Sequence, residues 1–338
     1  MPLVIRLATK IGAIDQVSVE ERKIHKKPIP RAGGLAIYGS FVLVCLVLLP
    51  NLSHRFAGLV AAGTIVLLVG LYDDVKGLSP WIKLIFQIVA ALVAVVGFGI
   101  GIESVTNPLG QMIVLTGNDV VVRIGTISFD VGMVATLFSV LWLVGLTNTI
   151  NLLDGLDGLS GGVSAIAAFI IFALAISPQV NQPDTALIAI ALSGACLGYL
   201  VYNFYPAKIF NGDSGAYFLG MTLGILAIFS GAKLATAALV LGVPIFDAVW
   251  AFIRRLATGR SPFSADRGHF HHLLIDVGLS QRQAVLIIYM LSAVFGGLAL
   301  VANSAQKIVA IGALLVIMVL SVGLLTLMRR RQHIKSKP

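Results

Sequence analysis

Long apolar runs separated by short polar segments occupy the sequence from about residue 33 onwards. A run of about 20 apolar residues is long enough to cross the hydrocarbon core of a bilayer as one helix. The runs lie near 33–50, 56–72, 81–101, 131–150, 159–176, 184–202, 215–232, 235–253, 284–302 and 308–328. The pattern therefore predicts an all-α, polytopic integral membrane helical bundle with about ten transmembrane helices.

Composition agrees with this fold class. The 338 residues are 58% hydrophobic and only 12% charged, whereas a soluble domain carries about 25% charged residues. Cys45 and Cys196 both fall inside apolar runs, so they indicate neither a disulfide framework nor a cysteine metal site.

The positions of lysine and arginine predict the orientation of the bundle in the membrane. If residues 1–32 lie on the inside and the loops then alternate, 20 of the 24 basic residues fall on the inside. Arg55, Arg123, Lys233 and Lys307 remain outside. An even number of spans also places both basic ends in the cytoplasm. The net charge of +9 thus reflects topology, and we expect no nucleic-acid partner because no basic patch is interleaved with aromatic residues.

Polar residues collect in five segments that all emerge on the predicted cytoplasmic side. The segments are HKKPIPRAGG (25–34), YDDVKGLSP (72–80), NLLDGLDG (151–158), NFYPAKIFNGDSG (203–215) and RRLATGRSPFSADRGHFHHLL (254–274). The outward loop at 102–130 contains nothing comparable, and its alternation of apolar and polar residues is typical of a small β-hairpin. Five polar clusters on one face predict a functional site there.

The spacing of the carboxylates suggests how they are arranged. Asp154 and Asp157 are three residues apart and would share one face of a helix, while Gly155 would allow close approach of another backbone or a phosphate. Asp73 and Asp74 are adjacent, so on a helix they point about 100° apart and are expected to have different roles. The structural alternatives are helix caps at 154 and 157, a solvated helix end at 73 and 74, and a turn at the NGDSG segment.

The histidines and one buried aspartate leave more than one interpretation open. His269, His271 and His272 are either ordinary loop histidines or part of the site, and a zinc site is a further alternative, although their spacing differs from the helical i, i+4 zinc motif. Asp247, in VPIFDAVWAF, lies within the eighth predicted span and could be structural or functional.

Carboxylates and amides without thiolates are hard oxygen donors, which suit Mg²⁺, with Mn²⁺ as a substitute. Basic side chains and glycine-rich turns on the same face are typical of phosphoryl chemistry, in which catalysis is mostly positioning and charge neutralisation. A site of this kind at the membrane surface is expected to join a water-soluble phosphate donor to a lipid acceptor.

The five segments, in this order, resemble the polyprenyl-phosphate N-acetylhexosamine-1-phosphate transferase family. The DRGHFHHLL form of the last segment is similar to the undecaprenyl-phosphate GlcNAc-1-phosphate transferase branch, which starts teichoic acid, O-antigen and related glycans. The resemblance implies a Mg²⁺-dependent phosphotransferase that converts UDP-GlcNAc and undecaprenyl phosphate to undecaprenyl-diphospho-GlcNAc and UMP. It also implies a multi-pass protein of the bacterial inner (cytoplasmic) membrane with a cytoplasmic active site. Relatives in this branch usually carry another apolar span before PLVIRLATKIGAIDQ, the segment within which this sequence begins.

The resemblance assigns roles to individual residues. Asp213 matches the metal ligand, and Asp154 and Asp157, with Asn151, match positions that line the nucleotide and metal. Phe210 and Asn203 match the surroundings of the uracil. Either Asp73 or Asp74 matches the pair proposed to handle the lipid phosphate or act as a base. Lys26 and Arg31 match the segment near the phosphates, and Arg267, His269, His271 and His272 match the loop thought to read the sugar and diphosphate.

This interpretation divides the chain into a cytoplasmic N-terminal segment at 1–32, a transmembrane catalytic domain at 33–328 and a basic cytoplasmic tail at 329–338. The active-site loops, notably 254–283, lie on the cytoplasmic side of the middle part. The partners expected are UDP-GlcNAc, undecaprenyl phosphate and the bilayer, and a homodimer is left open.

Three alternatives remain beside this reaction. The first is the same chemistry with another UDP-N-acetylhexosamine. The second is an ion-coupled transporter, although transporters place their carboxylates near the bilayer midplane, often in repeated halves. The third is a CDP-alcohol phosphotransferase, suggested by DGLDG, but Leu159, Ser160 and Gly161 follow where that family's motif needs other residues.

Overall fold

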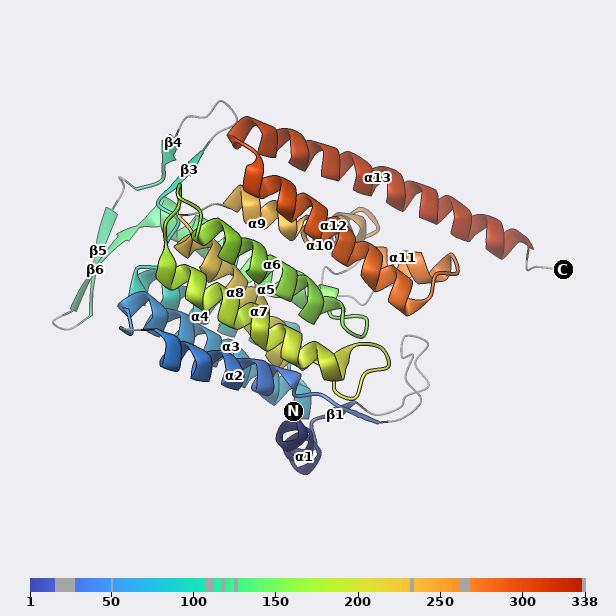
Figure 1. Cartoon of the computed structure of the whole chain (residues 1–338), viewed down its shortest axis with the longest axis horizontal. Helices are drawn as coiled ribbons and strands as arrows, with labels where there is room; N and C mark the ends of the chain where they lie inside the picture. Colours follow the sequence, from blue (N-terminus) through green and yellow to red (C-terminus); the bar gives the residue numbers. More distant parts are fainter. Residues whose placement is uncertain are drawn as a thin grey trace.

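The computed structural model describes residues 1–15, 28–49, 51–106, 112–116, 119–124, 127–231, 234–259, 261 and 268–335. Helices account for most of these residues (Figure 1). They are α1 (Pro2–Ile11), α2 (Gly33–Leu48), α3 (His54–Lys76), α4 (Pro80–Leu92), α5 (Met133–Leu153), α6 (Leu159–Ala175), α7 (Pro183–Asn203), α8 (Gly212–Phe229), α9 (Leu234–Val240), α10 (Gly242–Ala257), α11 (Phe270–Asp276), α12 (Gln281–Val301) and α13 (Ser304–Lys335). A short π-helix, η1 (Val93–Gly97), continues α4.

The strands form three small antiparallel pairs. Near the amino terminus, β1 (Ile14–Asp15) pairs with β2 (Ile29–Pro30). The loop that the sequence predicted to face outward holds two hairpins where the sequence suggested one: β3 (Ser104–Thr106) with β4 (Met112–Val114), and β5 (Asp119–Ile124) with β6 (Ile127–Gly132). Both hairpins lie at one end of the bundle, and α11 lies toward the other (Figure 1).

The helices are those of a polytopic membrane protein, but the predicted count of ten spans is not confirmed. Among the described residues, seven helices are long and apolar enough to cross a membrane, namely α3, α4 with η1, α5, α7, α8, α12 and α13. An eighth span results if α9 and α10, which meet at a bend of 81°, are counted as one. The predicted spans 33–50 and 159–176 correspond to the shorter apolar helices α2 and α6.

Local sequence signals explain where several helices begin and end. The hydroxyls of Ser53 and Ser79 accept hydrogen bonds from the first turns of α3 and α4, as N-cap residues do. Ser280 and Gln283 form a reciprocal capping box at the start of α12. Gly77 ends α3 with a φ of 72°, a conformation that favours glycine.

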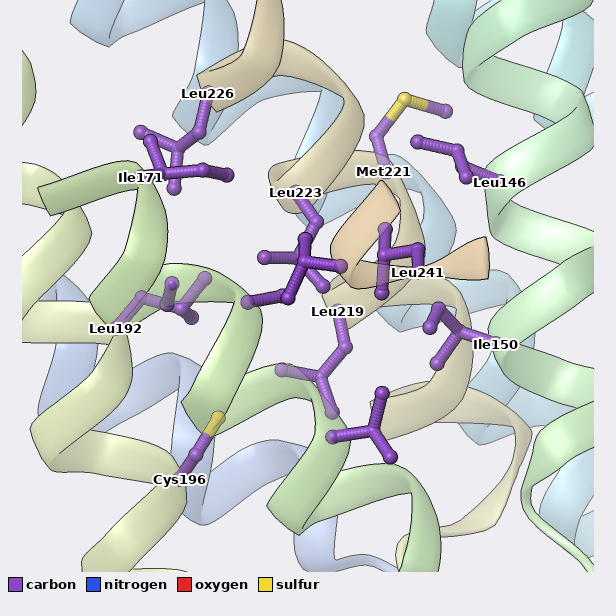
Figure 2. Packing of buried hydrophobic residues seen from close by; sticks show 14 of the residues in the cluster. Leu146, Ile150, Ile171, Leu192, Cys196, Leu219, Met221, Leu223, Leu226 and Leu241 are labelled. Atoms are coloured by element: carbon purple, nitrogen blue, oxygen red, sulfur yellow. The ribbon is translucent and has the colours of Figure 1, made fainter. Parts of the chain in front are cut away.

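Helix α8 forms the centre of the bundle. It contacts α2, α3, α5, α6, α7 and α9, and nearly all of its residues are buried. Figure 2 shows its leucine side chains between those of α5 on one side and those of α6 and α7 on the other; the labelled residues include Leu146, Ile150, Ile171, Leu192, Leu219, Leu223 and Leu226. Whatever α8 carries at its amino terminus is therefore fixed relative to most of the other helices.

Glycines allow α8 to approach its neighbours closely. A methyl group on Gly34 of α2 would overlap the backbone of Gly215, and one on Gly70 of α3 would overlap the backbone of Ser214. A methyl group on Gly220 would overlap the backbone of α5. Small residues that bring backbones together are a common basis of helix association in membranes, where packing replaces much of the hydrophobic driving force.

We expect Leu219→Ala, in the buried centre of α8, to destabilise the protein by about 2–5 kcal/mol, because a large-to-small change in a packed core leaves a cavity. Leu137→Ala on α5 is the control, since Leu137 is 63% exposed on the outside of the bundle. Thermal unfolding in detergent measures both variants. Equal changes in the midpoint would contradict the central position of α8.

Candidate active site

The end of α3 and the start of α8 form the first part of the site. Oδ1 of Asp74 accepts a hydrogen bond from the backbone N–H of Asp213 at 2.9 Å. Its Oδ2 accepts from the N–H and the hydroxyl of Ser214, at 3.2 and 2.9 Å. The first N–H groups of a helix have no partner within it, and Asn211, the N-cap residue of α8, makes no side-chain cap. Asp74 therefore caps α8 from a neighbouring helix.

Lys83, in the first turn of α4, links two carboxylates. Its Nζ donates to Oδ2 of Asp73 at 3.1 Å and to Oδ2 of Asp213 at 3.0 Å. Asp213 also accepts from the hydroxyl of Tyr217 at 2.8 Å and from the amide of Asn151 at 3.1 Å. The prediction of different roles for the two adjacent aspartates is consistent with this geometry, because Asp73 faces Lys83 while Asp74 faces α8.

Arg31 supplies the second cation of this cluster. Its Nε lies 3.6 Å from Oδ1 of Asp74, and its Nη2 lies 3.8 Å from Oδ1 of Asp213. Burial by itself would lower the pKa of Arg31, but the charges of Asp74 and Asp213 outweigh this effect and raise it above the ordinary value. The guanidinium group is therefore held in its charged form beside the carboxylates.

A hydrogen-bonded pair of amides lies one helical turn away from Lys83 and Asn151. Gln87, one turn after Lys83 on α4, accepts a hydrogen bond of 2.6 Å from Asn148, one turn before Asn151 on α5. Gln87 is almost fully buried, so this bond satisfies a polar group that would otherwise be costly to bury. The pair ties α4 to α5 at the level that brings Lys83 and Asn151 to the same carboxylate.

The segment between α5 and α6, residues 154–158, is called here the aspartate loop. The prediction that Asp154 and Asp157 share one helical face is wrong, because α5 ends at Leu153 and both residues lie in turns. Gly158, the N-cap residue of α6, has a φ of +83°, a conformation that favours glycine. Asp154 accepts a hydrogen bond from the hydroxyl of Ser160, and burial raises its pKa to about 7.

Neighbouring elements hold the aspartate loop in place. Oδ2 of Asp157 accepts from the N–H of Ala207 at 2.9 Å. Asn203, at the end of α7, accepts from the N–H of Gly158 and donates to the carbonyl of Ile209, each at 2.9 Å. The hydroxyl of Tyr289, on α12, donates to the carbonyl of Gly158. Asn203 is 3% exposed, so the structure gives it hydrogen bonds that join two loops.

Phe210 lies between the amino-terminal segment and α8. Its N–H donates to the carbonyl of Pro30, and its carbonyl accepts from the N–H of Gly33. Phe210 also forms a β-bridge with Arg31. As a residue Phe210 is partly exposed, so an aromatic side chain lies beside the carboxylate cluster.

The three histidines lie together at the start of α11. The rings of His269 and His271 stack with centroids 5.6 Å apart, and those of His271 and His272 lie 4.3 Å apart. Burial lowers the pKa of His271 to about 3, so its imidazole is neutral at physiological pH. The ring of His271 lies against Gly155, where an added methyl group would overlap it. His271 therefore contacts the aspartate loop.

The structure brings most of the predicted site residues together. Asp73, Asp74, Asp213, Asn151 and Arg31 belong to one hydrogen-bonded and ionic network, and the charge of Arg31 acts on Asp154 as well. The predicted residues Lys26 and Arg267 lie outside the described part of the chain.

Sequence reasoning missed several contributors to this arrangement. It assigned no role to Lys83, Tyr217, Ser160, Gln87 or Tyr289. A lysine and a glutamine one turn apart near the start of an apolar span are the one signal that could have drawn attention to α4.

The donor set is compatible with a hard cation. Within the described ranges, no group of three or more histidine, cysteine, aspartate or glutamate side chains has the arrangement of a metal site. Mg²⁺ usually takes only one or two protein carboxylates, with substrate phosphates and water as the other ligands. The buried Oδ1 of Asn211, between Ser160 and α8, has no hydrogen-bond partner among the described atoms. An oxygen-only set with an unsatisfied oxygen fits Mg²⁺ better than zinc.

Comparison with known proteins assigns the family. A profile of glycosyl transferase family 4 matches residues 56–231, which include Asp73, Asp74, the aspartate loop and Asp213. The chain is 37% identical over 312 residues to a probable undecaprenyl-phosphate N-acetylglucosaminyl 1-phosphate transferase of Bacillus subtilis, covering 90% of this chain and 81% of that protein. The chain belongs to glycosyl transferase family 4.

Two further relatives extend the comparison across bacterial groups. A decaprenyl-phosphate N-acetylglucosaminephosphotransferase of Mycolicibacterium smegmatis is 32% identical over 96% of this chain and 84% of its own length. An undecaprenyl-phosphate alpha-N-acetylglucosaminyl 1-phosphate transferase of Salmonella typhi is 29% identical over 88% of this chain and 78% of its own length. The predicted resemblance to this family and branch is thereby confirmed.

The two adjacent aspartates provide a test of the site geometry. We expect Asp74→Ala to destabilise this family member by about 1–3 kcal/mol, because it removes a cap and leaves buried N–H groups of α8 without a partner. Asp73→Ala removes an ion pair with Lys83 and a hydrogen bond from the N–H of Leu78, and it is expected to cost less than Asp74→Ala because Lys83 keeps Asp213 as a partner. Thermal unfolding of the two variants in the same detergent makes the comparison, and a larger loss for Asp73→Ala would refute the capping role of Asp74.

Proposed function

We propose that this protein transfers GlcNAc-1-phosphate from UDP-GlcNAc to undecaprenyl phosphate, giving undecaprenyl-diphospho-GlcNAc and UMP. The observation that carries the proposal is the convergence of Asp73 and Asp74 from α3, Lys83 from α4 and Asp213 from α8 on one cluster. The names of the relatives, which match along nearly the whole chain, supply the substrate class.

In the proposed reaction, an oxygen of the lipid phosphate attacks the β-phosphorus of UDP-GlcNAc. The bond between that phosphorus and the bridging oxygen breaks, and UMP leaves with the electron pair. A phosphate monoester is already substantially ionised at neutral pH, so the attack needs no strong base. Lys83 and Arg31 would offset the negative charge of the approaching phosphates, which is the main demand in phosphoryl transfer.

Asp213 and Asp154, with Asn151, are the residues that would hold Mg²⁺. When bound, the ion would neutralise diphosphate charge and polarise the phosphoryl oxygens. Four groups now surround the carboxylate of Asp213, so at least one of these contacts would be exchanged for the ion on binding.

A covalent aspartyl-phosphate is the rival to direct attack. Asp74 is poorly suited to be that nucleophile, because both of its oxygens already accept hydrogen bonds from α8. Both oxygens of Asp73 are engaged as well: Oδ2 accepts a hydrogen bond from Nζ of Lys83, and Oδ1 accepts one from the N–H of Leu78. We therefore favour direct attack, with Asp73 and Lys83 orienting the lipid phosphate.

The nucleotide and the sugar have candidate contacts on either side of this cluster. The partly exposed Phe210 offers an aromatic face on which the uracil could stack. Of the three histidines, His272 is partly exposed and could contact the sugar and its link to the diphosphate, whereas His269 and His271 are buried behind it. Asp157 and Asn203 would support these contacts by holding the loops.

The excess of basic residues on one side supports a location of the proposed active site on the cytoplasmic face of the bacterial inner membrane. This is the side on which a soluble nucleotide sugar would be available. The hairpins β3–β4 and β5–β6 would then face outward.

We expect purified protein to convert undecaprenyl phosphate and UDP-GlcNAc to UMP and a lipid diphosphate sugar, with loss of activity on chelation of Mg²⁺. UDP-GalNAc and UDP-glucose serve as competing donors, and UMP release and lipid product are both measured. Failure to form the lipid product with every donor tested would overturn the proposal.

Within this assay, Lys83→Met should lower kcat/KM by about 100-fold or more, since it removes a preorganised cation from the carboxylate cluster. Lys76→Met is the matched control, because Lys76 is exposed at the end of α3 and lies nearby in the sequence. Similar losses in both variants would argue against a role for Lys83 at the site.

The proposed orientation predicts different labelling of two introduced cysteines. In intact cells with a permeabilised outer barrier, Met112→Cys on the β3–β4 hairpin should react with a membrane-impermeant maleimide. Lys76→Cys should react only after the inner membrane is opened. Cys45 and Cys196 are buried and give a low background. Labelling of Lys76→Cys from outside would reverse the topology.

A further inference from the structure

A buried carboxylate outside the proposed substrate contacts holds the histidine segment. Asp247 lies on α10 and is only 4% exposed. Its Oδ2 lies 3.0 Å from Nδ1 of His269, and its Oδ1 accepts a hydrogen bond of 2.8 Å from the N–H of Phe270. Both oxygens are thus committed to the point where α11 begins.

This contact replaces a cap that α11 lacks. His269 is the N-cap residue of α11 and makes no side-chain cap hydrogen bond. A seven-residue helix has little stability of its own, so its position depends on contacts from outside. Asp247 supplies a buried contact at the first turn, whereas the ion pair between Asp276 and Arg329 at the last residue, with atoms 3.2 Å apart, is partly exposed and contributes little.

The first turn of α11 is also the part that meets the aspartate loop. His271 is 1% exposed, and its ring lies against Gly155, the residue after Asp154. Neither ring nitrogen of His271 has a hydrogen-bond partner among the described residues. The ring of His271 is therefore held by packing against Gly155 and by Asp247, whose Oδ2 lies 3.9 Å from Nδ1 of His271. Helix α10 packs along α5, the helix that leads into the aspartate loop. Helix α10 therefore contacts both α11, through Asp247, and the helix that carries the aspartate loop.

We propose that Asp247 is a positioning residue for the transfer reaction: through His269 and Phe270 it fixes α11 so that His271 stands against Gly155 beside Asp154. Asp247 itself does not contact substrate. The consequence for the reaction rests on the proposed function, in which the histidine segment meets the sugar and diphosphate of the donor. The link between Asp247 and His269 can be tested without that function.

The decisive variant is Asp247→Asn, which has nearly the same shape. The N–H of Phe270 and Nδ1 of His269 lie on different oxygens of Asp247. In Asp247→Asn one of these oxygens becomes an NH2 donor, so the side chain can no longer accept both hydrogen bonds in this geometry. We expect kcat/KM for UDP-GlcNAc to fall by about 10- to 100-fold, the size of effect that a small misplacement of reacting groups produces. The KM for undecaprenyl phosphate should stay unchanged.

Asp276→Asn is the matched control, because it makes the same chemical change at the other end of α11. It should leave both kinetic parameters near those of the parent protein. A general loss of active protein would lower kcat with either substrate, without a difference between the two substrates in KM. That result would overturn the proposal, and so would an equal effect of Asp276→Asn.

A second variant tests the contact at the far end of the link. Gly155→Ala places a methyl group against the ring of His271 and should reproduce the donor-specific loss. Because both changes disturb one arrangement, the double variant Asp247→Asn/Gly155→Ala should be little worse than the poorer single variant. Full additivity of the two free-energy losses would mean that the sites are independent and would contradict the proposal.

An activity-independent measurement separates this inference from the proposed function. In protein labelled with ¹⁵N-histidine, the His269 resonance, assigned by its loss in His269→Gln, should report a protonated Nδ1 in the parent protein. It should change tautomer in Asp247→Asn and stay the same in Asp276→Asn. An unchanged tautomer in Asp247→Asn would overturn the link. Absence of transfer by the parent protein, with the tautomer change present, would instead reject the proposed function.

Discussion

The carboxylate of Asp74 at the amino terminus of α8 is the contact on which the rest of the site depends. It satisfies two backbone N–H groups and a hydroxyl that begin the most buried helix of the bundle. Buried N–H groups without partners are costly, so the end of α3 and the start of α8 are held together. Gly70 makes this approach sterically feasible. With this contact in place, the side chain of Asp213 lies beside Lys83 and Arg31.

In this cluster each pair of neighbouring carboxylates has a cation beside it. Like charges on Asp73 and Asp213 would repel, and Lys83 lies within hydrogen-bonding distance of both. Arg31 plays the corresponding part between Asp74 and Asp213. Carboxylates at helix ends near a bilayer are expensive unless they are paired or reach water. The same pairing leaves cations and carboxylates close to one another, which is the arrangement required to receive phosphate groups and a divalent ion.

A second set of contacts holds the loops around the cluster. Asn203 and Tyr289 fix the backbone of Gly158 from α7 and α12, while Asp157 joins the aspartate loop to the segment that precedes α8. His271 meets Gly155 from the other side. Irregular backbone in a membrane protein is tolerated where its polar groups are satisfied by neighbouring helices, as they are here. The glycines of the DGLDG motif thus serve close packing between protein elements.

The sequence by itself determined the membrane class, the face that carries the site and the kind of chemistry. Those features depend on local properties: the length of apolar runs, the side on which Lys and Arg accumulate, and the residue types in five short segments. It also indicated that Asp73 and Asp74 point in different directions, because that follows from the helical repeat alone. The number of spans was less certain, since α2 and α6 are short and α9 and α10 are sharply bent.

Only the tertiary structure decided which aspartate caps α8, that Asp154 and Asp157 lie in turns, and that Lys83, Gln87 and Asp247 belong to the arrangement. Lys83 and Asp213 are 130 residues apart, and Asp74 and Asp213 are 139 apart. Periodicity within one helix cannot predict a contact between residues so far apart in the sequence. Such contacts depend on how closely the helices pack, and hence on glycines of one helix matched to backbone atoms of another.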